Sequence, residues 1–217
     1  MKRLIAATLF AAPLLGASLP ALAAPVNLVT NGGFESTTVS SGTWVIVNSA
    51  AGWTVGPQGL EIRNNVAGSA LSGSNFAELD TTTNSWISQI INTVLGTTYT
   101  LTFNYAARPD NQGANSNGLN WSIGNLSGTV GQDTNTAWQT FTTTFIGTGN
   151  GMTLRFGSIG RSDGYGTSLD DISITAAGGA STGAAAIPEP ESVALLMAGL
   201  GAMGLVLRRR KAGQGKA

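Results

Sequence analysis

The sequence predicts an all-β domain, specifically a jelly-roll β-sandwich, between an N-terminal signal helix and a C-terminal membrane sorting helix. Apolar and polar residues alternate with a period of two through the central part of the chain, and turn-forming clusters separate these runs. No stretch between residues 24 and 187 has a sustained helical period. Many short strands at such spacing are typical of a sandwich or a barrel.

The first 23 residues have the three parts of a secretory signal peptide. Lys2 and Arg3 are positively charged, residues 4–19 are mainly apolar, and residues 21–23 provide a small-x-small cleavage site. We expect cleavage after Ala23. The alternative, a membrane-spanning N-terminal helix, is disfavoured because the segment is short and contains two prolines and a glycine.

The clearest predicted strand covers residues 98–105. Tyr99, Leu101, Phe103 and Tyr105 alternate with polar residues, so the aromatic side chains share one face. The same alternation predicts strands around residues 60–62, 121–123, 141–145, 152–156 and 172–174. Together these strands define a predicted domain over residues 24–175.

The predicted exported body is acidic, although the whole chain has a formal net charge of zero. Between residues 24 and 187 there are four arginines, nine acidic residues and no lysine, so the net charge is −5. An acidic surface without a basic stripe repels phosphate backbones, so nucleic-acid binding is disfavoured. Neutral sugars or a cation suit this surface better.

The chain contains no cysteine and no histidine. It therefore has no thiol nucleophile, no imidazole base, no disulfide and no ordinary zinc or copper site. A bound metal would have to be a hard cation with oxygen ligands, and calcium is the leading candidate outside a cell.

The C-terminal region begins with a predicted flexible linker over residues 176–187, which contains mostly Ala, Gly, Ser and Thr. Residues 188–217 contain three further features, namely Pro188-Glu189-Pro190, an uncharged run over residues 192–207, and Arg208-Arg209-Arg210-Lys211. The uncharged run would reach only ~24 Å as a helix, short of the ~30 Å hydrocarbon core. The cations would keep its end on the cytoplasmic side. An ordinary anchor helix is the alternative.

This arrangement resembles the PEP-CTERM sorting signal of Gram-negative bacteria. The resemblance implies recognition by an exosortase-type sorting peptidase and cleavage near residues 188–190. It also implies a transient stay in the inner membrane, followed by delivery to the outer surface or the extracellular matrix.

The body carries a second resemblance, over residues 27–175. Its motifs are Asn-Gly-Gly-Phe-Glu at 31–35 with Gly-Trp at 52–53, the segments 75–80, 86–89 and 96–101, and Ser-Leu-Asp-Asp-Ile-Ser-Ile at 168–174. The opening and closing motifs are similar to galactose-binding-like jelly-roll domains, which include carbohydrate-binding modules and an uncharacterised plant cell-wall family. The middle segments also resemble bacterial surface domains with interchangeable C-terminal anchors. Trp53 matches a core tryptophan of this pattern.

The second resemblance also implies a structural calcium ion beside the first and last strands. The matching acids are Glu35 and the pair Asp170 and Asp171. Asp170 is favoured over Asp171 because simple alternation puts it on the same face as Ile172 and Ile174. The alternative is that Glu35 caps a turn and that the Asp pair is solvated.

Sugar binding requires flat apolar faces and planar polar side chains. The loops 108–117 and 161–166 are rich in Gly, Asn and Asp, and each contains an arginine. The candidate ligand-binding residues are Arg108, Asn111, Arg161, Asp163 and Tyr165. The alternative for both loops is that they are solvated connections. Among the tryptophans, Trp53 and Trp121 are expected in the core.

Glu78 and Asp80 lie two residues apart, and their spacing would suit the acid pair of a glycosidase. No second acid pair or nucleophile motif supports this, so we expect no enzymatic activity. The prediction is an exported carbohydrate-binding protein that associates with extracellular polysaccharide. The alternative is a passive structural protein of the surface or matrix, without a defined ligand site.

Overall fold

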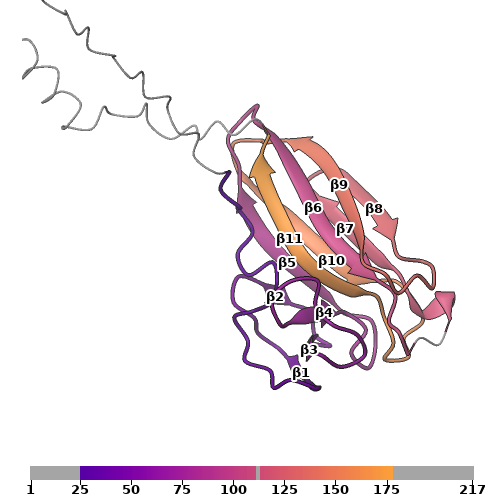
Figure 1. Ribbon diagram of the computed structural model, residues 1–217. Helices are drawn as coiled ribbons and strands as arrows, with labels where there is room; N and C mark the ends of the chain where they lie inside the picture. Colours follow the sequence, from indigo (N-terminus) through magenta and orange to yellow (C-terminus); the bar gives the residue numbers. More distant parts are fainter. Residues whose placement is uncertain (1–24, 111–112, 178–217) are drawn as a thin grey trace, which may run out of the picture. The chain divides into compact units, whose positions relative to one another are not determined.

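The computed structural model describes residues 25–110 and 113–177, which fold into two antiparallel β-sheets (Figure 1). The predicted jelly-roll β-sandwich is confirmed. The signal peptide, most of the linker and the sorting segment lie outside the described residues. No helix within the described part is long and apolar enough to cross a membrane.

The larger sheet has six strands and the smaller has five. In spatial order the larger contains β1 (Thr43–Val47), β3 (Leu60–Asn64), β4 (Phe76–Glu78), β11 (Ser168–Ala176), β6 (Thr98–Ala106) and β9 (Gln139–Ile146). The smaller contains β2 (Thr54–Val55), β5 (Trp86–Asn92), β10 (Gly151–Ser158), β7 (Leu119–Ile123) and β8 (Leu126–Val130). A short 3₁₀ helix, η1 (Ala114–Ser116), precedes β7.

The core lies between the two sheets, and aromatic rings join them. Phe103 of β6 packs edge-on against Phe156 of β10, with ring centroids 4.9 Å apart, and lies 6.4 Å from Trp121 of β7. Trp53 is also buried and stacks on Phe34. The alternating positions predicted for β6 are therefore correct, and so are the predicted core positions of Trp53 and Trp121.

One detail of the last strand differs from the prediction. A register shift between Asp170 and Ser173 inserts an extra residue, and Asp171 has a positive φ of 48°. This β-bulge reverses the alternation, so Asp170 pairs with Asn104 on the outer face of the sheet rather than sharing the inner face with Ile172. The prediction from simple alternation was therefore wrong.

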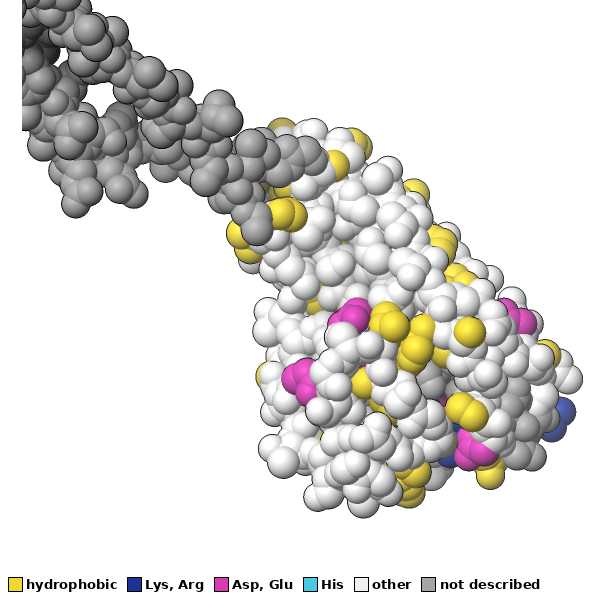
Figure 2. All heavy atoms as spheres, viewed as in Figure 1, with side chains coloured by type: hydrophobic (Ala, Val, Ile, Leu, Met, Phe, Trp, Pro, Cys, Tyr) yellow, Lys and Arg dark blue, Asp and Glu magenta, His cyan; other side chains and the backbone are white. Residues whose placement is uncertain are grey.

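The two ends of the sandwich differ in charge. We call the end with loops 107–118, 131–138 and 159–167 the charged end, and the end with loops 93–97 and 147–150 the terminal end. The first and last described residues lie at the terminal end (Figure 1). On the face shown in Figure 2, acidic and basic side chains are absent from the terminal end.

Candidate functional site at the charged end

The two loops predicted to form a ligand site meet at the charged end. The backbone N–H of Arg161 donates to the carbonyl of Asn115 over 2.7 Å, and the hydroxyl of Ser116 donates to Asp163 over 2.8 Å. At the start of β7, the N–H of Gly118 donates to Thr167 over 2.8 Å. Segments about fifty residues apart in the chain thus form one surface.

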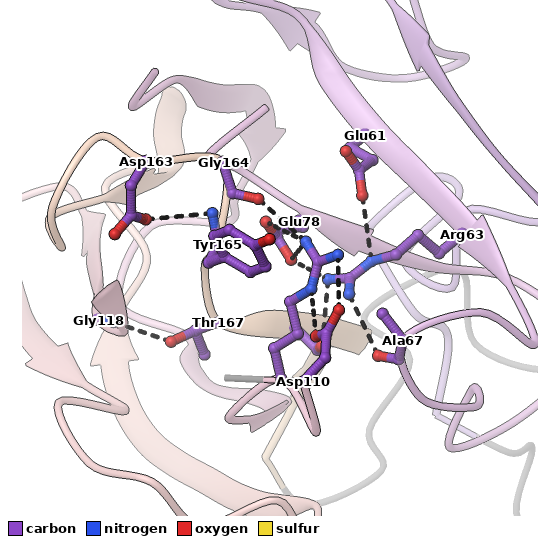
Figure 3. Close-up of polar contacts among 12 residues, drawn as sticks. Glu61, Arg63, Ala67, Glu78, Asp110, Gly118, Asp163, Gly164, Tyr165 and Thr167 are labelled. Atoms are coloured by element: carbon purple, nitrogen blue, oxygen red, sulfur yellow. Dashed lines mark hydrogen bonds and ion pairs between the residues drawn. The ribbon is translucent and has the colours of Figure 1, made fainter. Parts of the chain in front are cut away.

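Arg108 connects these loops to the interior. Its guanidinium lies 4.8 Å from the centroid of the Tyr165 ring, and its Nη1 donates to the carbonyl of Gly164 over 3.0 Å. Its Nε donates to Asp110 over 2.6 Å, and its Nη1 is 3.3 Å from Glu78. Figure 3 shows that Tyr165, Asp110 and Glu78 lie close together. Arg108 therefore mainly holds the site together.

Below Arg108 lies a buried ion network on the outer face of the larger sheet. Arg63 of β3 pairs with Glu78 of β4, and neither side chain is exposed (Figure 3). Arg63 also donates to Ala67 and Ser168, and its Nε lies 3.5 Å from Glu61. These side chains share one face because they alternate with the core residues of their strands.

Burial dominates the electrostatics of this network. It raises the pKa of Glu78 to about 7, even though Arg63 and Arg108 act to lower it. Burial also raises the pKa of Glu61 and lowers that of Arg63. Removing these charges from water costs free energy, and the attraction between the paired charges offsets this cost.

The two acids weighed as a hydrolytic pair are both buried. Glu78 is paired with two arginines, and Asp80 accepts the backbone N–H of Asp163 over 3.1 Å. Burial raises the pKa of Asp80, and the N–H of Asp163 opposes this. Two acids of a glycosidase must reach the sugar from either side. Here both side chains are excluded from solvent, with Glu78 paired to arginines and one oxygen of Asp80 accepting the Asp163 N–H.

A small pocket of about 200 Å³ lies beside this network. Its wall includes Trp138, whose Nε1 donates to the carbonyl of Ser69 over 3.1 Å and whose ring packs edge-on against Phe76. Ala107 and Pro109 also line it, so the pocket borders the Arg108 loop. The sequence prediction did not include this pocket or the Arg63–Glu78 pair.

The other predicted ligand-binding residues have different environments. Arg161 is exposed, and Tyr165 is half-buried under Arg108. Asp163 is half-buried, with one oxygen accepting the Ser116 hydroxyl and the other the N–H of Tyr165. Asn111 lies outside the described residues. Arg161 is therefore the member of the set that is best placed to contact a ligand.

The three predicted metal ligands gather around the loop 71–75. Glu35 accepts the N–H groups of Ser74 and Asn75, both over 2.8 Å. Asp170 accepts the N–H of Leu71 over 2.9 Å, and Asp171 accepts the hydroxyl of Ser72 over 2.6 Å.

The carboxylates therefore fix this loop through hydrogen bonds, because Glu35 Oε1 and Asp170 Oδ2 each accept two backbone N–H groups. Within residues 25–110 and 113–177, no group of three or more acidic residues is arranged to hold a metal ion. Calcium binding by Glu35, Asp170 and Asp171 stays a prediction.

The chain matches a known protein family. Residues 27–175 match the family described as "Protein of unknown function (DUF642)". The chain belongs to the DUF642 family. The match covers the whole sandwich of this DUF642 protein, from the segment before β1 to the last strand. No curated protein matches the chain.

Residues 186–211 match the PEP-CTERM protein-sorting motif. This confirms the first resemblance. The motif indicates that the DUF642 protein is exported and that sorting anchors it transiently in a membrane.

Several solved structures are similar to the DUF642 domain. One is a family 61 carbohydrate-binding module in complex with β-1,4-galactotriose, with 15% identity and a TM-score of 0.48, covering 70% of this chain and 99% of the module. A family 35 carbohydrate-binding module from Clostridium thermocellum has 16% identity and a TM-score of 0.43, covering 71% and 100%. Another, from Paenibacillus barcinonensis, has 20% identity and a TM-score of 0.38, covering 62% and 99%.

Proposed function

We propose that the DUF642 domain is a non-catalytic module that binds extracellular polysaccharide at the charged end. The observation that supports this most directly is the convergence of loops 108–117 and 161–166 into one surface. Binding residues commonly gather on loops held by a rigid scaffold. The sandwich provides such a scaffold, because residues 27–175 form a continuous two-sheet core.

The chemistry of this surface suits a sugar. Arg161 offers an exposed planar group with several N–H donors, and Tyr165 in the same loop offers aromatic surface. Trp138 adds aromatic surface in the pocket that borders the Arg108 loop. Sugars combine apolar C–H faces with hydroxyl groups, so they need aromatic and planar polar groups together. The carboxylate of Asp163 accepts the backbone N–H of Tyr165 and so keeps the Tyr165 backbone in place.

The proposed location follows from the sorting motif at residues 186–211. An exosortase-type peptidase would recognise this motif and release the domain to the outer surface or the exopolysaccharide matrix. The net charge of −5 between residues 24 and 187 disfavours anionic polymers with phosphate groups. Neutral polysaccharide is therefore the preferred ligand class.

One observation favours a passive structural role instead. Arg108 and Asp163 have most of their polar atoms engaged within the protein. If Arg161 were also unimportant, the charged end would only cap the sandwich.

The test compares the parent protein with the single variants Arg161→Ala and Tyr165→Ala. It measures their retention by polysaccharide in affinity electrophoresis and their binding to a glycan array. We expect both variants to lose retention. For Arg161→Ala the melting temperature should stay within about a degree, because changes at exposed loop residues usually alter stability by less than ~0.5 kcal/mol. Tyr165→Ala should also lower the melting temperature, because it removes the half-buried ring that contacts Arg108. Arg155→Ala is the matched control, because Arg155 stacks on Trp86 in the smaller sheet. Unchanged retention by the loop variants would exclude this site. A parent that binds no glycan would favour the structural role.

A further inference from the structure

A cluster of exposed apolar side chains lies at the terminal end, away from the proposed sugar site. Leu95 is 76% exposed and Val94 51% exposed, in the turn between β5 and β6. Ile146, at the end of β9, is 56% exposed, and Leu126, at the start of β8, is 40% exposed. We call these four residues the terminal patch.

The members of the terminal patch are neighbours in space. The N–H of Gly96 donates to the carbonyl of Gly147 over 2.9 Å, which joins the Val94–Leu95 turn to the residue after Ile146. Ile146 and Leu126 line the same open pocket, of about 640 Å³. The patch therefore runs across one end of both sheets. Grouped exposed apolar residues often mark an interaction surface.

The terminal patch is also surrounded by uncharged sequence. Residues 90–104, 119–132, 139–154 and 172–177 contain no Asp, Glu, Lys or Arg. On the face shown in Figure 2, this end carries hydrophobic side chains and no acidic or basic ones. A partner for this surface must accept apolar groups without charge pairing.

The path of the chain favours the membrane surface as this partner. Leu28 donates its N–H to Ile174 over 2.8 Å, and Ala177 donates its N–H to Thr98 over 2.8 Å, so both described chain ends leave the sandwich at the terminal end. Ten residues separate Ala177 from Pro188. Even fully extended, this segment reaches at most about 40 Å. Ala177 therefore cannot lie farther than this from Pro188, where the Pro-Glu-Pro of the sorting motif begins.

We propose that the terminal patch rests on the surface of the lipid bilayer while the protein is anchored. Removing its apolar side chains from water is favourable in proportion to the area buried. A weak contact is sufficient, because the linker keeps the patch at high effective concentration near the surface. The absence of basic residues means that the contact does not depend on anionic lipid. It would point the charged end, with its proposed sugar site, away from the membrane.

The experiment uses the full chain reconstituted in phosphatidylcholine vesicles through its C-terminal segment. Because the chain has no cysteine, a single Thr148→Cys substitution provides a labelling site in the exposed turn beside the patch. Thr134→Cys provides the matched control in an exposed loop of the charged end. We expect an environment-sensitive dye at residue 148 to shift its emission to shorter wavelength and to be quenched by nitroxide-labelled lipid. The dye at residue 134 should show neither effect.

A double variant tests the patch itself. Leu95→Asn combined with Ile146→Asn should abolish lipid quenching at residue 148, because both side chains are exposed and their replacement leaves the core unchanged. Raising the salt concentration should not reduce the quenching. Equal quenching at residues 134 and 148, or none at either, would overturn the proposal. A wavelength shift that grows with protein density and shows no lipid quenching would assign the patch to a second copy of the chain instead.

Discussion

Arg63 and Glu78, on the neighbouring strands β3 and β4, form an ion pair whose two side chains are both excluded from solvent. The pair supports Arg108, which reaches it from the loop after β6. The stability of the sandwich and the shape of the charged end therefore depend on the same buried charges.

Replacing Arg63 by Met should lower the free energy of unfolding by about 3–5 kcal/mol, because the buried Glu78 would lose its closest partner and would have to stay charged without it or take up a proton. The double variant Arg63→Met/Glu78→Leu should recover much of this loss. Urea unfolding measures both effects, and Arg155→Met, on the smaller sheet, is the control. A single variant as stable as the parent would show that the pair contributes nothing.

Substitution of two tryptophans should change the stability by very different amounts. Trp53 is buried, stacks on Phe34 and donates its Nε1 hydrogen to the carbonyl of Asn31, so Trp53→Ala should cost about 3–5 kcal/mol. Trp44 lies on the edge strand β1 and is 52% exposed, so Trp44→Ala should change stability by less than about 1 kcal/mol. Thermal unfolding of the two variants compares them. Similar losses would contradict the assignment of Trp53 to the core.

Asp170 should make stability depend on pH. Burial raises its pKa to about 6, and the N–H groups of Asp171, Leu71 and Ser72 only partly oppose this. The unfolded chain therefore loses the proton first as the pH rises, and the folded state loses stability between about pH 4 and pH 6.

Relative to Asp170→Asn, the parent should become less stable by up to about 3 kcal/mol between pH 4 and pH 7, since each pKa unit corresponds to about 1.4 kcal/mol. Chemical unfolding at both pH values measures the difference. The other buried acids are common to the two proteins and cancel. A parent that gains stability relative to the variant would mean that the N–H groups favour the ionised carboxylate.

Calcium binding at Glu35, Asp170 and Asp171 is tested by chelation. A ligand at a hundredfold excess over its Kd stabilises the folded state by ~2.7 kcal/mol, so a chelator should lower the melting temperature by several degrees if the site forms. Glu35→Gln should remove this difference, while its amide oxygen can still accept the N–H groups of Ser74 and Asn75. Identical melting curves of the parent with and without chelator would reject the site.

Processing can be read directly by mass spectrometry of protein from its native host. We expect an N-terminus near Ala24, because the signal peptide ends in a small-x-small site, and a C-terminus near Pro188–Pro190, within the matched sorting motif. Protein recovered inside the cell provides the unprocessed control. Intact chain ending at Ala217 outside the cell would contradict sorting by cleavage.

The alternating residues of β6 and the three-part C-terminal motif could be interpreted from the sequence alone. A period of two determines which side chains face the core, so Tyr99, Leu101 and Phe103 are buried as predicted. The PEP-CTERM motif is a linear signal, and its order of residues is itself the information. The all-β class, the export of the protein and the core positions of Trp53 and Trp121 were therefore available before the structure.

Only the tertiary structure decided the contacts between distant segments. The bulge at Asp171 reversed the face of Asp170, because a positive φ at one residue is not visible in an alternating pattern. The Arg63–Glu78 pair depends on the register between β3 and β4, and the apolar terminal patch depends on which loops meet at one end. Register and the packing of loops arise from the whole core, so no local stretch of the sequence determines them.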